Sequence, residues 1–144
     1  MDKEIGAKGM PERTGSCGCG NLTVTTRGEP SEVHACSCLN CQRESGSAFS
    51  YCAVFPDAAV SIAGERRVWR RYVDSGRWLE TEFCPACGVT VISRSEHSPG
   101  TIGVAVGCYA DPHFAKPERL VWASRRHHWL QFPDSIEFVE TEPD

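Results

Sequence analysis

The chain has 144 residues, of which 40% are hydrophobic and 24% are charged, and its formal net charge is −4. This length and composition are typical of a single soluble globular domain with a real hydrophobic core. The acidic balance argues against a protein that mainly binds nucleic acid, and no apolar stretch is long enough to cross a membrane.

Short strands separated by glycine and proline turns follow one another along most of the chain. Residues 1–14 precede them, and we expect a flexible lead-in there. Short runs of β-branched and apolar residues predict strands over residues 22–26, 32–36, 50–55, 59–63, 67–73, 78–83, 89–93, 102–106 and 120–123. One helical turn is expected over residues 39–45, where Gly46 stops it.

The last part of the chain has a weaker pattern. Residues 129–132 predict an irregular segment that closes the core, and residues 139–144 predict an acidic tail. No amphipathic helix longer than a turn or two is apparent. We therefore predict a single all-β domain over residues 15–138.

Seven of the nine cysteines fall into three tight clusters. They are a pair at Cys17 and Cys19, a triplet within residues 36–41, and a pair at Cys84 and Cys87. Residues 1–15 lack the apolar run of a signal peptide, so we expect a cytoplasmic protein, in which reducing conditions disfavour disulfides. Such clusters are typical of metal ligation. Four cysteines close a tetrahedral zinc site, whereas three leave one position open.

The two cysteine pairs predict a closed structural zinc site. Its ligands are Cys17, Cys19, Cys84 and Cys87. Gly88 follows the second pair and can take a positive φ, which lets backbone amides point at the sulfurs. The alternatives are buried free thiols or a redox CxxC motif, but a redox motif is expected in a βαβ context, which this chain lacks.

The triplet leaves more alternatives open. Cys36, Cys38 and Cys41 predict either an open zinc site that can bind a substrate thiol, or a second structural site completed from elsewhere. Candidates for that fourth ligand are Cys52, Cys108, His34, His97, His113, His127 and His128. In a third arrangement, Cys36 or Cys41 joins the pairs and the chain holds one zinc ion. Otherwise Cys52 and Cys108 are expected to be core thiols.

Four stretches together resemble the glutathione-dependent formaldehyde-activating enzyme family, which includes centromere protein V-like domains. They are Gly15-Ser16-Cys17-Gly18-Cys19-Gly20, Cys36-Ser37-Cys38-Leu39-Asn40-Cys41-Gln42-Arg43, Gly46-Ser47-Ala48-Phe49 and Phe83-Cys84-Pro85-Ala86-Cys87-Gly88. The resemblance runs from about Gly15 to Phe138. It implies short, coiled antiparallel sheets stapled by zinc in a β-tent-like fold. It also implies two zinc ions per chain, a structural one at the cysteine pairs and a catalytic one at Cys36, Cys38 and Cys41.

The same resemblance implies an activity. Members of the family are named for joining formaldehyde to glutathione, which gives S-hydroxymethylglutathione. Two stretches depart from the family pattern: Gly107–Asp111 replaces the usual Gly-Thr-Leu-Asp-Asp, and Arg119–Trp122 lacks the usual histidine before an Ile-Trp pair. If these stretches line the pocket, the substrate is expected to differ.

Two basic runs are candidates for binding a substrate carboxylate. In the first, over residues 66–71, Arg70 and Arg71 are the candidate substrate-binding residues, because arginine suits bidentate contacts with carboxylates. The alternative is a solvated strand surface. The second run, over residues 125–128, has the same two interpretations. The four tryptophans are expected in the core or the pocket wall.

Two functional hypotheses follow. The first is a zinc-dependent carbon–sulfur lyase or synthase that joins a glutathione-like thiol to a small aldehyde, with no nucleic-acid or membrane partner. The second is a non-enzymatic, zinc-stapled β module that carries a thiol metabolite or docks a protein partner.

Overall fold

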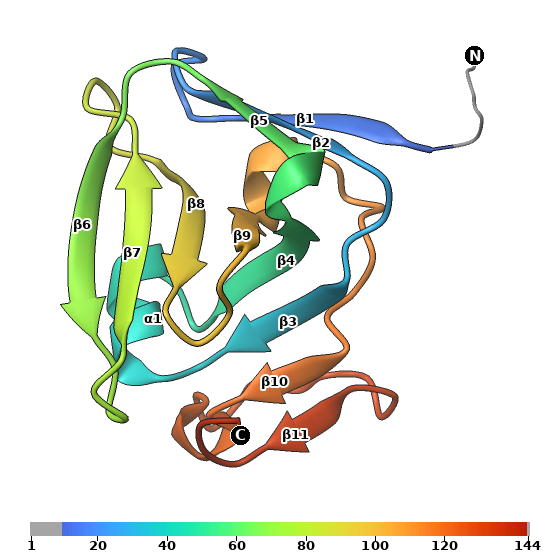
Figure 1. Ribbon diagram of the computed structural model, residues 1–144. Coiled ribbons are helices and arrows are strands. Elements are labelled where there is room, and N and C mark those ends of the chain that lie inside the picture. The colour runs from blue at the N-terminus through green and yellow to red at the C-terminus, as the bar shows by residue number, and fades with distance from the viewer. Residues whose placement is uncertain (1–9, 144) are drawn as a thin grey trace.

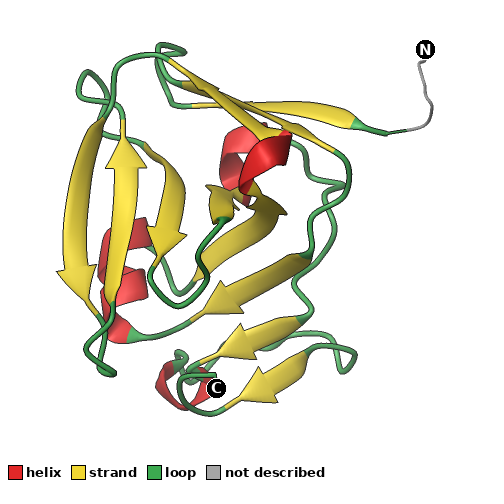
Figure 2. Cartoon of the chain, in the orientation of Figure 1, coloured by secondary structure: helices red, strands yellow, loops and turns green. Residues whose placement is uncertain are grey.

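The structure, a computed structural model, describes residues 10–143 and consists mainly of short strands (Figures 1 and 2). The strands are β1 (Glu12–Ser16), β2 (Thr23–Arg27), β3 (Glu32–Cys36), β4 (Ser50–Pro56), β5 (Val60–Ala63), β6 (Arg67–Tyr72), β7 (Trp78–Phe83), β8 (Thr90–Ser95), β9 (Thr101–Ala105), β10 (Arg119–Val121) and β11 (Glu137–Val139). The helices are α1 (Leu39–Ser45) and three 3₁₀ turns, η1 (Asp57–Ala59), η2 (Val106–Tyr109) and η3 (Ala123–Arg125). The all-β prediction is confirmed.

The strands form two sheets. The smaller sheet has the order β1-β2-β5, and the larger has the order β11-β10-β3-β4-β9-β8-β7-β6. In Figure 1 the small sheet lies across the top of the molecule, and the large sheet curls beneath it. The short, coiled sheets match the predicted fold class. The bounds of β3, β7 and α1 also coincide with the ranges predicted for them.

Two strand pairings depart from the antiparallel pattern. β10 pairs in parallel with both β3 and β11, whereas the other pairings in the two sheets are antiparallel. Parallel neighbours need a long connection between them. Here residues 37–118, which include α1 and the strands β4 to β9, connect β3 to β10, so β10 enters beside β3 in the same direction.

Both sheets contribute to one hydrophobic core. Val24 from the small sheet packs with Phe55, Ile102 and Val104 from the large sheet, and all four are at most 1% exposed. Burial of these apolar side chains is the main force that holds the two sheets together. A smaller cluster around Leu120 lies under β3 and β10. The predicted irregular segment over residues 129–132 reaches that cluster through Phe132, whose ring centroid is 5.2 Å from that of Phe49.

The chain ends differ from the sequence-based boundaries. β1 begins at Glu12, within the segment predicted as a lead-in, and residues 1–9 lie outside the described residues. The predicted tail begins in β11, and the Trp122 amide donates to the Thr141 carbonyl oxygen at 3.2 Å. Residue 144 is likewise outside the described range. Between residues 10 and 143, no helix has the length and apolar character needed to span a membrane.

Candidate metal centres and the adjoining cavity

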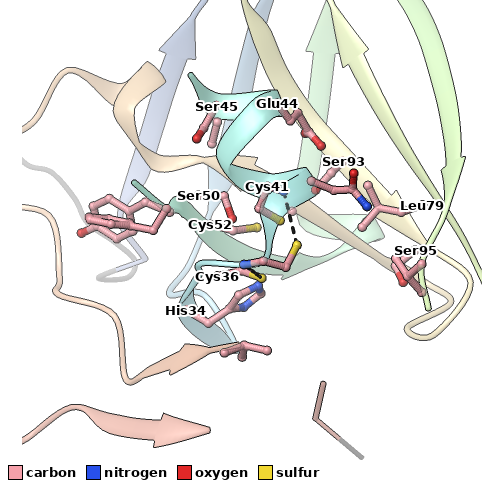
Figure 3. A pocket seen from close by; sticks show the side chains of 18 of the residues that line it. His34, Cys36, Cys41, Glu44, Ser45, Ser50, Cys52, Leu79, Ser93 and Ser95 are labelled. Carbon is pink, nitrogen blue, oxygen red and sulfur yellow. Dashed lines mark hydrogen bonds between the residues drawn. The ribbon is translucent and has the colours of Figure 1, made fainter. Parts of the chain in front are cut away.

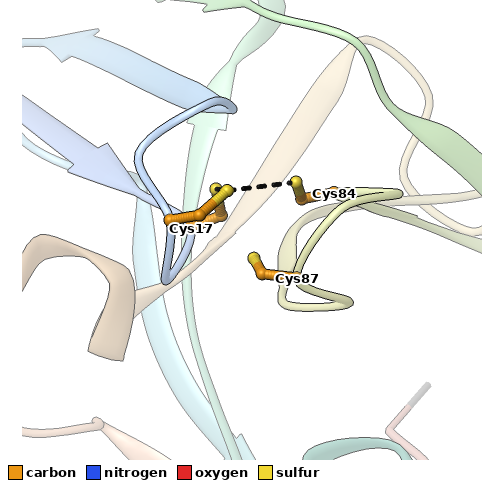
Figure 4. Close-up of side chains that lie close together, drawn as sticks. Cys17, Cys84 and Cys87 are labelled. Carbon is orange, nitrogen blue, oxygen red and sulfur yellow. Dashed lines mark hydrogen bonds between the residues drawn. The ribbon is translucent and has the colours of Figure 1, made fainter.

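The two cysteine pairs converge on one point between the sheets. One pair follows β1 and the other follows β7, and the four sulfurs all lie within 4.8 Å of one another (Figure 4). The Cys19 sulfur is 3.7 Å from the sulfurs of both Cys17 and Cys84. Sulfurs placed tetrahedrally at about 2.3 Å from one ion would be about 3.8 Å apart. The group, which we call the four-cysteine group, therefore has the size of a zinc site.

Backbone turns hold the four-cysteine group in place. The Leu22 amide donates to the Cys17 sulfur at 3.2 Å, and the Gly88 amide donates to the Cys84 carbonyl at 2.7 Å. Gly88 has φ +80°, as expected for the turn after a CxxC pair. Burial disfavours the charged form of Cys17, but the Leu22 amide and the neighbouring sulfurs outweigh it and lower its pKa to about 6. This environment favours the thiolate of Cys17, the form that metal binding requires, whereas at Cys19 the hydrogen bond from the Asn21 backbone is outweighed by burial and the neighbouring sulfurs, which raise the pKa to about 11.

The triplet sulfurs lie at the junction of β3 and α1. Cys36 ends β3, Cys38 is the N-cap of α1, and Cys41 lies in the first turn of the helix. The Cys41 amide donates to the Cys38 sulfur at 3.3 Å, so a thiol takes the capping role that Ser or Asp usually fills. The three sulfurs lie within 4.8 Å of one another. We call them the three-cysteine group.

Their closeness separates the acidities of the three thiols. Hydrogen bonds from Cys36 and Cys41 lower the pKa of Cys38, while hydrogen bonds with Cys38 and Cys41, together with burial, raise the pKa of Cys36. Three thiols crowded in this way share their protons, and a cation that replaces those protons stabilises all three sulfurs.

No fourth ligand completes the three-cysteine group within residues 10–143, because no further Cys, His, Asp or Glu offers an atom within 4.8 Å of all three sulfurs. Cys108 donates instead to the Thr90 carbonyl at 3.5 Å. His34 is not part of the group either. Its Nδ1 atom lies 3.3 Å from Glu32 Oε2, in an orientation that does not form a hydrogen bond. Of the alternatives that the sequence leaves open, this geometry favours three sulfurs with one free position.

The three-cysteine group faces a cavity of about 1060 Å³ (Figure 3). All three cysteines line it, and so do His34 and Cys52. Gly107, Arg119, Val121 and Trp122 supply further wall residues, which places parts of both stretches that depart from the family pattern at the cavity. Substrate preference can therefore differ from that of a relative with the usual residues there.

The first basic run divides between two environments. Arg71 lines the cavity, and its Nη2 lies 3.7 Å from the Cys41 sulfur. Arg70 points elsewhere: it pairs with Glu80 at 2.7 Å, and its guanidinium stacks 4.4 Å from the Trp78 ring centre. The two predicted substrate-binding residues are thus brought to different surroundings, with Arg71 beside the sulfurs and Arg70 in a surface ion pair.

Other cationic side chains also line the cavity. The sequence predicts a carboxylate contact for only one of the two described next, Arg125. Arg125, from the second basic run, stacks 4.8 Å from the Trp122 ring centre. Arg43, on α1, lies near Asn40. Within the described part of the chain neither has an acidic partner, whereas Arg119 is paired with Glu32 at 2.7 Å. Arg43 was missed because it follows the cysteine motif as a single charge, with no basic run to mark it.

The four tryptophans lie in different surroundings. Trp122 lines the cavity as expected, and Trp78 is half-buried beneath Arg70. Trp69 is 51% exposed, so the prediction of a core or pocket position is wrong for it, whereas Trp129 is 60% exposed and lines a second, open pocket with His127. Trp69 lies on β6, the last strand of the large sheet, and no further strand among residues 10–143 pairs with it on its outer side.

The family profile described as "Glutathione-dependent formaldehyde-activating enzyme" matches residues 12–125. The chain belongs to this family. A member from Penicillium rubens, named "Putative glutathione-dependent formaldehyde-activating enzyme", is 32% identical over 80 residues, covering 56% of this chain and 41% of that protein. A relative of the same name from Aspergillus terreus is 29% identical over 82 residues, covering 56% and 41%. The matches thus span less than half the length of these relatives.

A solved structure has a similar fold. A crystal structure of a Rhodobacter sphaeroides protein superposes with a TM-score of 0.51 at 19% identity, and the match covers 66% of this chain and 85% of that one.

The donor sets of this family member also fit a metal. Seven cysteine sulfurs in two compact groups are soft ligands, which suit zinc better than magnesium or calcium.

Proposed function

We propose that the chain is a zinc-dependent carbon–sulfur lyase that joins a glutathione-like thiol to a small aldehyde such as formaldehyde. The observation that carries this proposal is the three-cysteine group, which opens on a large cavity and lacks a fourth ligand among residues 10–143. In this proposal Cys17, Cys19, Cys84 and Cys87 hold a structural zinc ion. Cys36, Cys38 and Cys41 hold a catalytic one, which gives two zinc ions per chain.

A zinc ion at the three-cysteine group would supply a binding position for the substrate sulfur in its thiolate form, which is the nucleophilic form. The chain itself does the positioning. β3 and the N-terminus of α1 fix the three sulfurs on one wall of the cavity, and the opposite walls confine the aldehyde. Thiols add to aldehydes without a catalyst, so the main gain is the orientation of two confined reactants.

The arginines of the cavity are the proposed contacts for substrate carboxylates. Arg43 and Arg125 line the cavity and lack an acidic partner among residues 10–143, so their guanidinium groups are available to an anionic thiol. The sequence also predicts Arg70 and Arg71, but each already has an acidic partner, Glu80 and Glu44 respectively, and Arg70 does not line the cavity. Loss of one charge-assisted hydrogen bond costs about 1.5–3 kcal/mol, roughly a tenfold or greater loss of affinity for the thiol.

We further propose a cytoplasmic location, because reducing conditions keep nine cysteines as thiols.

X-ray absorption at the zinc edge tests the proposal. Protein purified under reducing conditions should hold two zinc ions, one with four sulfur ligands and one with three, an average of about 3.5 sulfurs per zinc. Glutathione should raise this average to about 4, because its sulfur takes the free position. An average already at 4 without glutathione would mean that another cysteine closes the site, and the lyase proposal would then fail.

A rate measurement completes the test. The initial rate of hydroxymethyl adduct formation, followed by NMR, should exceed the spontaneous rate with the wild-type protein and fall to it with Cys38→Ser. Cys52→Ser is the matched control: Cys52 lines the same cavity but is not part of the three-cysteine group. Its rate should stay close to the wild-type value.

The second candidate is a module that binds a thiol metabolite without turnover. The open three-cysteine group and its cavity also favour such a module, because either could hold a thiol without catalysis. The uncatalysed reaction is easy, so binding alone is a sufficient role. It predicts the same increase in sulfur coordination with glutathione but no rate above the spontaneous one. The two measurements together therefore separate the enzyme from the carrier.

A further inference from the structure

Arg71 occupies an unusual position on the outermost strand of the large sheet. The other residues of β6 are all exposed, whereas the Arg71 side chain is only 9% exposed. It lies opposite Leu79 in the register with β7 and lines the cavity. A guanidinium group loses much of its hydration on burial, so a buried arginine needs specific partners.

Two partners come from α1, about 30 residues earlier in the chain. Arg71 Nη2 lies 3.7 Å from the Cys41 sulfur and 3.3 Å from Glu44 Oε1, and Nε lies 3.4 Å from the same oxygen. Cys41 and Glu44 are three residues apart, so they lie on one face of the helix. Glu44 thereby fixes the guanidinium in the place where it meets the sulfur.

The charges at the group explain the need for this contact. Three thiolates around a doubly charged zinc ion leave a net charge of −1, and a bound substrate thiolate would raise it to −2. Within residues 10–143, no other cationic side chain donates to a sulfur of the three-cysteine group. Arg71 is therefore the one described cation placed to offset that charge directly.

We propose that Arg71 is a positioning residue for the metal at the three-cysteine group, where it donates to the Cys41 sulfur, holds that ligand in place and offsets the negative charge of the group. This inference rests on the proposed zinc at that group. It gives Arg71 a different role from the carboxylate contact expected from the sequence, because the Arg71 guanidinium group already contacts Cys41 and Glu44. Partners of this kind orient metal ligands and tune their electron donation.

The expected effect is on metal affinity. Loss of a partner that orients a metal ligand typically weakens metal binding on the order of 10- to 100-fold. Arg71→Met removes the donor and keeps a long apolar stem, so the three-cysteine group should lose about tenfold or more in zinc affinity. The four-cysteine group shares no contact with Arg71 and should be unchanged, which makes it an internal reference.

The test is a competition titration of the full chain with a chromophoric zinc chelator, repeated with cobalt(II), whose sulfur-to-metal charge-transfer band reports on the electron density at the sulfurs. The variants are Arg71→Met, Arg71→Lys and Glu44→Gln. Arg70→Met is the matched control, because Arg70 is adjacent on β6 but pairs with Glu80. Arg71→Met should lower affinity for the second zinc and shift the band. Arg71→Lys and Glu44→Gln should give smaller changes in the same direction, and Arg70→Met none.

Three results would overturn the inference. Affinity and band position unchanged in Arg71→Met would remove the positioning role, while the wild type still bound two zinc ions. Weaker glutathione binding with unchanged metal affinity would make Arg71 a substrate contact. A wild type that binds only one zinc would overturn the proposed function together with this inference. Should Arg71→Met fail to fold, the comparison of Arg71→Lys and Glu44→Gln with Arg70→Met decides in the same way.

Discussion

Gly103 shows how tightly single residues define the cavity wall. It lies on β9, and a methyl group added there would come within 2.5 Å of the Cys52 sulfur and 2.8 Å of the Ser93 hydroxyl oxygen. Both neighbours line the cavity. The backbone of Gly103 does not have a positive φ, so the need for glycine is one of space. The absence of one side chain thus sets where Cys52 and Ser93 lie.

Gly103→Ala should therefore destabilise the protein through overpacking, by about 1–3 kcal/mol. The double variant Gly103→Ala/Cys52→Ala should recover much of that loss, because it removes the shortest contact. Gly107→Ala is the control, since Gly107 also lines the cavity but has nothing within 4 Å of an added methyl group. Urea unfolding of the four proteins measures the free energies. Equal losses in Gly103→Ala and Gly107→Ala would contradict the steric argument.

The parallel junction of β3 and β10 includes a partly exposed ionic contact. Arg119 donates to Glu32 Oε2 at 2.7 and 3.1 Å, and the Val33 amide donates to Glu118 at 3.3 Å. The nearby His34 and then Arg119 lower the pKa of Glu32 to about 2, against the opposing effect of burial. The two strands are thus joined by side chains as well as by the short ladder between them.

This pKa shift predicts a dependence of stability on pH. The folded-state pKa of Glu32 lies below its ordinary value of 4.5, so its contribution is complete above that pH and is lost as the pH falls towards about 2. Glu32→Gln should cost about 1 kcal/mol at pH 7, because the carboxylate is partly solvated. The difference from the wild type should shrink between pH 4.5 and pH 2, as measured by urea unfolding.

The control for that prediction is Glu29→Gln. Glu29 is 69% exposed and pairs with Arg13 at 3.3 Å, so its removal should change stability little at any pH. Acid would also displace zinc from the proposed cysteine ligands, but it would do so in all three proteins. A Glu32→Gln difference that stayed constant down to pH 2 would rule out the ionic contribution.

The elements that the sequence predicts well are those with a local signal. The 32–36 strand alternates buried and half-buried residues, and Gly46 ends α1 in the left-handed conformation that glycine favours. β1 was missed because residues 12–16 carry no alternating apolar pattern and pair with a strand that follows a turn. The parallel pairing of β10 depends on contacts about 85 residues apart, which no local pattern reveals.

The candidate site shows the same division. Cysteine spacing was enough to predict which sulfurs gather, because ligands two and three residues apart can meet at one point. The burial of Arg71 could not be predicted, since the stretch Arg67–Tyr72 has the composition of a solvated strand. Its environment depends on how β6 lies against α1, and that packing is set by the whole sheet. That Arg43 and Arg125 lack an acidic partner among residues 10–143 is likewise a property of the assembled cavity.

At the scale of the molecule, the two cysteine groups connect different parts. The four-cysteine group joins the turn after β1, in the small sheet, to the turn after β7, in the large sheet. The three-cysteine group joins only β3 to α1, which are adjacent in the chain. A metal that closes a long loop restricts the unfolded chain far more than one that closes a short loop. The proposed structural zinc should therefore matter more to folding.

Cys87→Ser should consequently destabilise the domain by about 3 kcal/mol or more, which corresponds to a loss on the order of 10 °C in Tm. Cys87 is exposed, so lost metal binding rather than lost packing would account for the effect. Cys38→Ser should lower Tm by less than half as much while abolishing the proposed activity, and Cys52→Ser is the control outside both groups. Calorimetry of the zinc-loaded proteins measures all three. If Cys38→Ser and Cys87→Ser lowered Tm equally, the three-cysteine group would have a structural role, and the proposed lyase would lose its main support.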